Sequence, residues 1–140
     1  MAINIEEVQT GISLLDRQHE RYFDTVERVL QLCREQNLEP QTIEDLLIRV
    51  REYAVDNFDT EEYLMTLENY PEYEEHKAKH DFFKDRIEAF APRIEGGQLQ
   101  ESTNLAKELY ALLVDWFNTQ IKDDDMKLAH FLNERNRENT

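Results

Sequence analysis

The chain has 140 residues, of which 34% are charged, and its formal net charge at neutral pH is −15. This length is sufficient to bury a hydrophobic core, and we expect residues 1–140 to form a single domain. The strong negative charge argues against a nucleic-acid backbone or an anionic membrane surface as a partner.

Two helices are predicted before Pro71, separated by a loop at Pro40, because proline ends helices. Apolar and aromatic residues recur there at three- and four-residue steps, the spacing of one face of an α-helix. The first stripe is Leu15, His19, Tyr22, Val26, Leu30 and Cys33, and the second is Leu46, Val50, Tyr53, Asn57, Glu61 and Leu64. We expect Ser13 to cap the first helix, and Thr42 with Asp45 to cap the second.

Two further helices are predicted after Pro71, with a loop at Pro92 and the following pair Gly96 and Gly97. Their stripes are Tyr73, His76, His80, Phe83, Ile87 and Phe90, and then Leu105, Leu109, Leu112, Trp116 and Gln120. The tail from Asp123 onward is expected to continue as helix and then to fray. No segment alternates polar and apolar residues, so the sequence predicts an all-α fold, an antiparallel up-down-up-down four-helix bundle.

The cysteine content and the N-terminal sequence bear on the compartment. A single cysteine, Cys33, excludes an intramolecular disulfide. The first ten residues, MAINIEEVQT, lack a basic region followed by an apolar stretch, so we expect no secretory signal. No segment approaches the ~18 consecutive apolar residues of a membrane-spanning helix. These features predict a cytoplasmic protein that is not inserted in a membrane.

Polar side chains interrupt all four stripes at positions where the pattern calls for an apolar residue. A buried carboxylate or imidazole without a partner costs several kcal/mol, so a group of them needs a common explanation. In an antiparallel bundle, the start of the first and third helices and the end of the second and fourth share one end. We therefore expect these residues to meet there, together with Asp125: His19, Asn57, Glu61, His76, His80 and Gln120.

Imidazole and carboxylate groups from facing helices are the ligands with which helix bundles hold iron or manganese. Each i,i+4 pair, Asn57 with Glu61 and His76 with His80, projects two such groups from one helical face. Glu61 and Asp125 are the candidates for carboxylates that bridge two metal ions. We expect the neighbouring Glu62 to face water.

Each of these residues also has a simpler interpretation when it is taken alone. The histidine pair can be solvated or hydrogen-bonded, and His19 can be a satisfied core histidine. A run such as DDD, which includes Asp125, is usually a solvated helix end, and its five-residue spacing from Gln120 is not a same-face step in an α-helix. We expect His130 to be peripheral.

Four stretches of the sequence resemble the hemerythrin family, including the bacterial hemerythrins. They are LLDRQHERYF, DNFDTEEYLM, YPEYEEHKAKHDFF and LLVDWFNTQIKDDD, and they are spread over about residues 12–125. The resemblance implies a four-helix bundle around a non-haem di-iron centre that binds dioxygen reversibly. It also implies that His19, Glu61, His76, His80 and Asp125 are metal ligands, with Glu61 and Asp125 bridging.

Two positions depart from the family pattern, because Asn57 and Gln120 stand where the family has histidine. The resemblance then implies one metal position that keeps His76 and His80 and another that keeps only His19. The amides either coordinate weakly or preserve a hydrogen-bond network. A single metal, a mixed pair, zinc or manganese are the alternatives to a di-iron centre.

Three functions remain open from the sequence. The first is a hemerythrin-like metal-binding protein that handles dioxygen or iron, with dioxygen or another small ligand as its partner at the metal. The second is a metal-free or weakly metal-binding interaction or sensory module that retains the bundle. The third is an iron-dependent redox enzyme, for which the sequence shows no substrate pocket.

Overall fold

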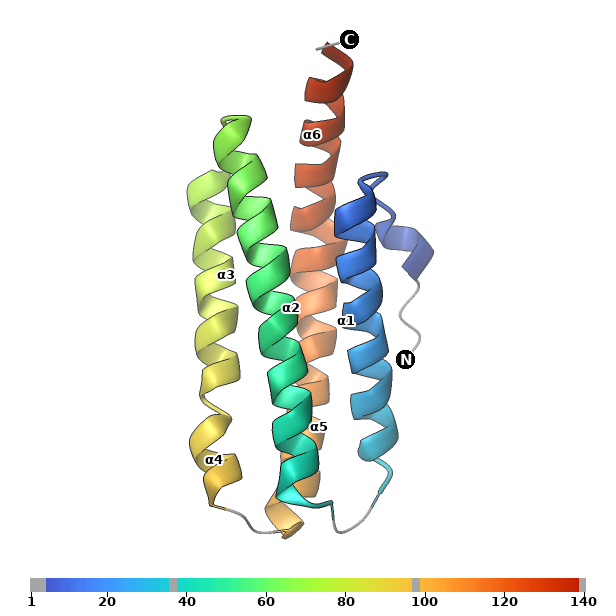
Figure 1. Cartoon of the computed structure of the whole chain (residues 1–140), viewed down its shortest axis with the longest axis vertical. Coiled ribbons are helices and arrows are strands. Elements are labelled where there is room, and N and C mark those ends of the chain that lie inside the picture. The colour runs from blue at the N-terminus through green and yellow to red at the C-terminus, as the bar shows by residue number, and fades with distance from the viewer. Residues whose placement is uncertain (1–4, 36–37, 97–98, 139–140) are drawn as a thin grey trace.

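The protein is all-α in the computed structural model, which describes residues 5–35, 38–96 and 99–138, and those ranges contain no β-strand. Four long helical rods lie roughly parallel to one another (Figure 1). In chain order the elements are η1 (Ile5–Val8), α1 (Ser13–Leu32), α2 (Pro40–Leu67), α3 (Tyr73–Glu88), α4 (Ala91–Glu95), α5 (Leu99–Trp116), η2 (Phe117–Asp125) and α6 (Met126–Glu138).

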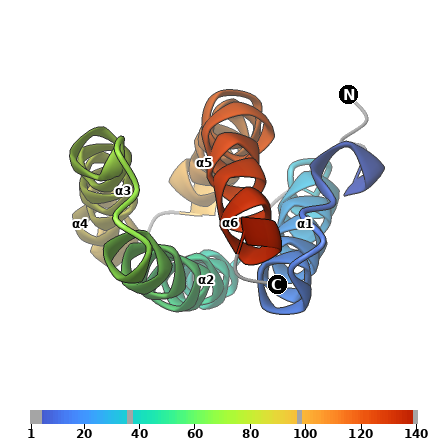
Figure 2. The same ribbon diagram turned by 90° about the horizontal axis from the view of Figure 1, so that it is seen from above.

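The rods run up, down, up and down, as predicted from the sequence. The fourth rod is α5, η2 and α6 in succession, and α6 extends past the ends of the other rods (Figure 1). Seen from above, α2 lies between α1 and α3, and α1 packs on its other side against α5 (Figure 2). The first turns of α1 and α3 therefore share one end of the bundle with the last turns of α2 and with η2. None of the described helices is long and apolar enough to cross a membrane.

The two predicted N-caps are wrong. Helix α1 starts at Ser13 itself, and no side chain caps it from the preceding residue, Ile12. Instead the carboxylate of Asp16, in the first turn, accepts hydrogen bonds from the backbone N–H and the hydroxyl of Thr10, at 2.8 and 2.7 Å. Helix α2 starts at Pro40, so Thr42 lies inside its first turn rather than before it.

The three prolines play different roles. Pro40 is the first residue of α2 and Pro92 lies in the first turn of α4, where a missing N–H has no structural cost. Pro71 alone lies in a loop, the turn from Glu68 to Glu72. Gly96 follows α4 directly as its C-cap residue, whereas Gly97 is outside the described residues, as are Asn139 and Thr140 of the predicted frayed tail.

The turn between α2 and α3 fixes the register of the two helices. Asn69 adopts a left-handed backbone conformation (φ 55°), which asparagine tolerates better than most residues. This conformation lets the Tyr70 N–H donate to the Met65 carbonyl at 2.9 Å. The tight turn holds the first turns of α3 against the last turns of α2.

The end of the bundle away from this turn is filled by an aliphatic core. Its most buried members include Val29, Leu32, Ile43, Leu47, Leu105 and Leu109, each at most 1% exposed. Three leucines of the stripes, Leu30, Leu64 and Leu112, are only half-buried, and the adjacent Val29, Met65 and Leu113 take the core positions. A four-residue step overshoots one helical turn by about 40° and a three-residue step falls about 60° short of it, so one misplaced step takes a residue off the core face.

Candidate metal centre

The polar residues predicted to share one end of the bundle are buried there. His19, Asn57, Glu61, His76, His80, Gln120 and Asp125 are each at most 4% exposed. They come from all four rods, with His76 and His80 on α3 and Gln120 and Asp125 on η2. The predicted convergence is confirmed for Glu61, His76, His80 and Asp125, whose ligand atoms lie within 4.8 Å of one another.

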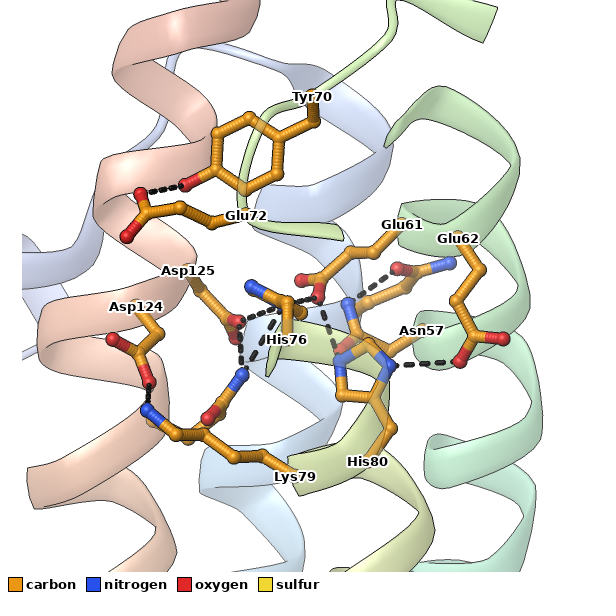
Figure 3. A network of polar contacts seen from close by, with 12 residues as sticks. Asn57, Glu61, Glu62, Tyr70, Glu72, His76, Lys79, His80, Asp124 and Asp125 are labelled. Atoms are coloured by element: carbon orange, nitrogen blue, oxygen red, sulfur yellow. Dashed lines mark hydrogen bonds and ion pairs between the residues drawn. The ribbon is translucent and has the colours of Figure 1, made fainter. Parts of the chain in front are cut away.

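The centre of the cluster is a set of contacts between two imidazoles and two carboxylates (Figure 3). The Nε2 atom of His76 lies 2.8 Å from Glu61 Oε1 and 3.1 Å from Asp125 Oδ1. The Nε2 atom of His80 lies 3.1 Å from the same Glu61 oxygen. One oxygen of each carboxylate therefore faces the histidine pair of α3. We call His76, His80, Glu61 Oε1 and Asp125 Oδ1 the α3 half of the cluster.

His19 lies beside Asp125 but outside that four-residue group, and we call His19 with the two remaining oxygens, Glu61 Oε2 and Asp125 Oδ2, the α1 half. Here His19 Nε2 lies 3.8 Å from Asp125 Oδ2, too far for a hydrogen bond. Among the described residues, no hydrogen-bond partner exists for either ring nitrogen of His19, for Glu61 Oε2 or for Asp125 Oδ2. Four buried polar atoms without partners are costly, and an imidazole with two carboxylate oxygens is a donor set that suits a transition-metal cation.

Asn57 is tied into a hydrogen-bond network beside the α1 half. Its amide nitrogen donates to Gln18 Oε1 at 2.9 Å, and its amide oxygen accepts from the Tyr53 hydroxyl at 3.2 Å. Gln18 in turn donates to the Thr60 hydroxyl at 3.1 Å. Sequence reasoning missed Gln18, although its position three residues after Leu15 and four before Tyr22 placed it on the buried face.

Gln120 stays in contact with the cluster. Its Nε2 atom donates to Asp125 Oδ1 at 3.2 Å and lies 3.1 Å from His76 Nε2. The π-helical form of η2 explains this contact, because a π-helix closes its turns between residues five apart. Of the run DDD, Asp123 is exposed and Asp124 half-buried, whereas Asp125 is 2% exposed, so the run is not wholly solvated.

Glu62 was expected to face water, and this expectation is wrong. Its side chain is only 17% exposed, and its Oε2 atom lies 2.8 Å from His80 Nδ1 (Figure 3). The imidazole is also stacked on Phe58, with ring centroids 3.9 Å apart and planes 3° from parallel. Glu62 and Phe58 together fix the ring so that Nε2 points at Glu61, the role that outer carboxylates have at metal sites.

The electrostatics of the cluster favour a protonated His76 beside an ionised Asp125. Burial lowers the pKa of His76, but hydrogen bonds to Asp125 and Glu61 outweigh it and raise that pKa to about 10. Burial raises the pKa of Asp125, but His19 and His76 outweigh it and hold that pKa well below its usual range. For His19, burial is outweighed by Asp125 and Glu61, and its pKa is raised.

The fourth histidine, His130, is exposed on α6 and belongs to no cluster of potential ligands in the described part of the chain, as predicted. Trp116 is 7% exposed and packs on Phe58 and Phe83. It is therefore a core residue, as expected from its place in the fourth stripe.

Comparison with known proteins agrees with this arrangement. The family model described as "Hemerythrin HHE cation binding domain" matches residues 10–132. Bacteriohemerythrin of Pseudomonas aeruginosa strain LESB58 is 27% identical over 86% of this chain and 74% of its own length. The Stenotrophomonas maltophilia bacteriohemerythrin is 25% identical over 89% and 76%, and that of Clostridium acetobutylicum is 24% identical over 86% and 92%. With the fold, the buried histidine–carboxylate cluster and the family match in agreement, the chain belongs to the hemerythrin family.

Proposed function

We propose that the protein binds non-haem iron in the buried cluster, as a pair of ions that share Glu61 and Asp125. The observation that carries this proposal is the α1 half, where His19, Glu61 Oε2 and Asp125 Oδ2 have no hydrogen-bond partner among the described residues. Each carboxylate presents one oxygen to the α3 half, and the second oxygen of Asp125 lies 3.8 Å from His19 Nε2. A second cation beside His19 would compensate the burial of these atoms.

The two metal positions are expected to differ in affinity. In the α3 half, two imidazoles and two carboxylate oxygens supply four donors. In the α1 half, His19 and the remaining two oxygens supply three, because the amide of Asn57 is occupied by Gln18 and Tyr53. The α3 half therefore fills first, and at limiting supply the protein carries a single iron, or zinc or manganese, at that position.

Bound iron would supply the capacity to bind dioxygen or another small ligand, as the family resemblance implies. The protein's own residues keep the cluster dry and oriented. Phe58 stacks on His80, and Tyr70 packs edge-on against His76 with ring centroids 6.4 Å apart. With only three protein donors, the α1 half is the position at which a small ligand completes the coordination.

The second candidate, a metal-free interaction module, is favoured by a specific observation. A protonated His76 between Glu61 and Asp125 satisfies the α3 half without any cation. That arrangement leaves the α1 half unsatisfied, so we place it second.

Elemental analysis of the natively purified protein, followed by anaerobic titration with Fe(II), separates the two candidates. We expect uptake in two steps, a rise in the unfolding midpoint, and a near-ultraviolet charge-transfer band after exposure to air. No stoichiometric metal and no thermal stabilisation by Fe(II) would establish the metal-free module instead.

A double variant, Asn57→His with Gln120→His, tests why the two positions differ. We expect it to tighten the second step of uptake more than the first. A matched surface control, Gln31→His with Gln41→His, adds two exposed histidines and is expected to leave both steps unchanged. If neither the native chain nor the double variant binds metal, the geometry of the cluster cannot hold it, and the proposal is wrong.

A further inference from the structure

A hollow of about 200 Å³ opens between α3 and the fourth rod, outside the buried cluster. Its walls include Phe82 and Phe83 from α3 and Leu112 and Trp116 from α5, and Gln120 of η2 also lines it. Neither the family match nor the cluster accounts for this hollow, because none of the four α3-half residues lines it.

The size and walls of the hollow fit one aromatic ring. An apolar cavity of about 150 Å³ holds a benzene molecule, whereas sites for drug-sized ligands start at about 300 Å³. The rings of Phe83 and Trp116 lie with centroids 4.3 Å apart and planes 33° from parallel. A third ring can meet these two edge-on or offset, the arrangements that aromatic side chains favour.

The charges at the hollow indicate an anionic substituent on that ring. Lys79 and Arg86 of α3 line it, against one carboxylate, Asp115 of α5. Lys79 is paired with Asp124, but Arg86 forms no ion pair with any carboxylate in the described ranges, and its guanidinium lies 5.7 Å from the Phe82 ring centroid. Arg86 is therefore the cation at the hollow that, among the described residues, remains without an ion pair, although the chain as a whole carries a net charge of −15.

We propose that this hollow binds a small single-ring aromatic carboxylate, with the ring between Phe83, Trp116 and Leu112 and the carboxylate at Arg86. Such a ligand accepts charge-assisted hydrogen bonds from the guanidinium and buries its ring against apolar walls. The site does not depend on a metal. Gln120 lines the hollow and also contacts the cluster, since its amide lies 3.1 Å from His76 Nε2.

Benzoate is the probe, and the metal-free full chain is the test material. Trp116 is the only tryptophan of the chain, so its fluorescence reports directly on the hollow. We expect benzoate to change this fluorescence saturably and to bind about fivefold more tightly than benzamide, which has the same ring without the charge. The preference is expected to decrease as salt is added. No saturable fluorescence change and no calorimetric heat with either compound would overturn the site, and equal affinities would overturn the choice of an acid.

Two variants locate the site. Arg86→Gln is expected to lower the affinity for benzoate about fivefold and to leave the affinity for benzamide unchanged. Arg28→Gln, on the exposed face of α1, is expected to change neither affinity. Leu112→Phe, which narrows the hollow, is expected to lower the affinity for both compounds. Calorimetry measures the affinity, and circular dichroism checks that the variant is folded. An unchanged benzoate affinity in Arg86→Gln contradicts the proposal whether or not the Leu112 variant folds. Iron uptake is measured separately. Failure of the metal proposal therefore leaves the benzoate result intact, and failure to bind benzoate leaves the metal proposal intact.

Discussion

The two halves of the buried cluster share the same two carboxylates but are satisfied very differently. In the α3 half, His76 and His80 each contact a carboxylate oxygen at 2.8 to 3.1 Å. In the α1 half, His19 Nε2 lies 3.8 Å from Asp125 Oδ2, and the polar atoms there have no hydrogen-bond partner among the described residues. The polar atoms of the α3 half are therefore paired with one another, whereas those of the α1 half are left without hydrogen bonds in the part of the chain that the structure describes.

The two amides that depart from the family pattern explain part of this difference. Gln120 reaches the cluster and donates to Asp125, so its amide still supports the α3 half. Asn57 is engaged by Gln18 and Tyr53, and its amide has both of its polar atoms occupied there. At the two positions where the resemblance implies histidine, one amide therefore supports the α3 half, whereas the other is bound by neighbouring residues.

The largest effect is expected from Glu61, one of the two carboxylates that the halves share. Glu61→Gln removes the negative charge from both positions while keeping the shape of the side chain. Since loss of an outer partner alone costs 10–100-fold in metal affinity, we expect a loss of more than about 100-fold for both steps of uptake. Anaerobic Fe(II) titration and metal content of the purified variant are the measurements, with the exposed Asp81→Asn as control. Retention of either step would show that Glu61 does not bridge.

The next largest effect separates the halves. His80→Gln is expected to abolish the tight first step, because it removes one of two imidazoles from the α3 half. His19→Gln is expected to remove only the second step, because it takes the sole imidazole of the α1 half. Zinc calorimetry distinguishes them, with two sites in the native chain, only the weak site in His80→Gln and only the tight site in His19→Gln. Identical losses in both variants would contradict two separate positions.

The fold was predictable because it depends on periodicity and loop length. Four stripes at helical spacing and short connections were enough to place the rods and to bring their polar interruptions to one end. The errors are local, as at Ser13 and Thr42. There the sequence offers several residues able to satisfy the first backbone N–H groups, and only the geometry of the chain decides among them.

The site was predictable for residues on the stripes and less so for their supports. Gln18 and Glu62 each lie next to a predicted ligand in sequence, and adjacent residues on a helix point about 100° apart. Sequence spacing alone assigned Glu62 to solvent, whereas the closeness of α3 turns it toward His80. The contact between Gln120 and Asp125 was unexplained by α-helical spacing, because the sequence did not reveal that η2 is a π-helix.

A smaller effect is expected from the residue that orients His80. Glu62→Gln removes the carboxylate from His80 Nδ1 but can still accept a hydrogen bond there. We expect the first step of metal uptake to weaken by about tenfold, and Glu62→Ala by up to about 100-fold, with the second step affected only through the shared carboxylates. Competition with a chromophoric zinc chelator measures the first step. An equal loss for Glu62→Gln and Glu62→Ala would show that Glu62 acts through its charge rather than through orientation.

Over a single pH unit, the effect of pH on the α3 half is expected to be no larger than that of Glu62→Gln. Because the pKa of His76 is raised to about 10, its imidazole is protonated at neutral pH in the metal-free protein, and a metal must displace that proton. Zinc affinity should rise by about tenfold per pH unit for each proton released, and this rise should flatten above about pH 10. Zinc competition across this range measures the slope, and the exposed His130→Gln is expected to leave it unchanged.

The stability of the metal-free protein should follow the same group in the opposite sense. The pKa of His76 in the folded state lies above the ordinary histidine value of 6.5, so protonation stabilises the fold. This contribution is complete below about pH 6.5 and is lost as the pH rises through about 10, so the unfolding midpoint should fall over that interval. Glu61→Gln should reduce the fall, because it removes one of the two carboxylates that hold the proton on His76. A midpoint that is constant from neutral pH to about 10 would mean that the α3 half is not an ion-paired network, and that its four donors are no better satisfied without a cation than those of the α1 half.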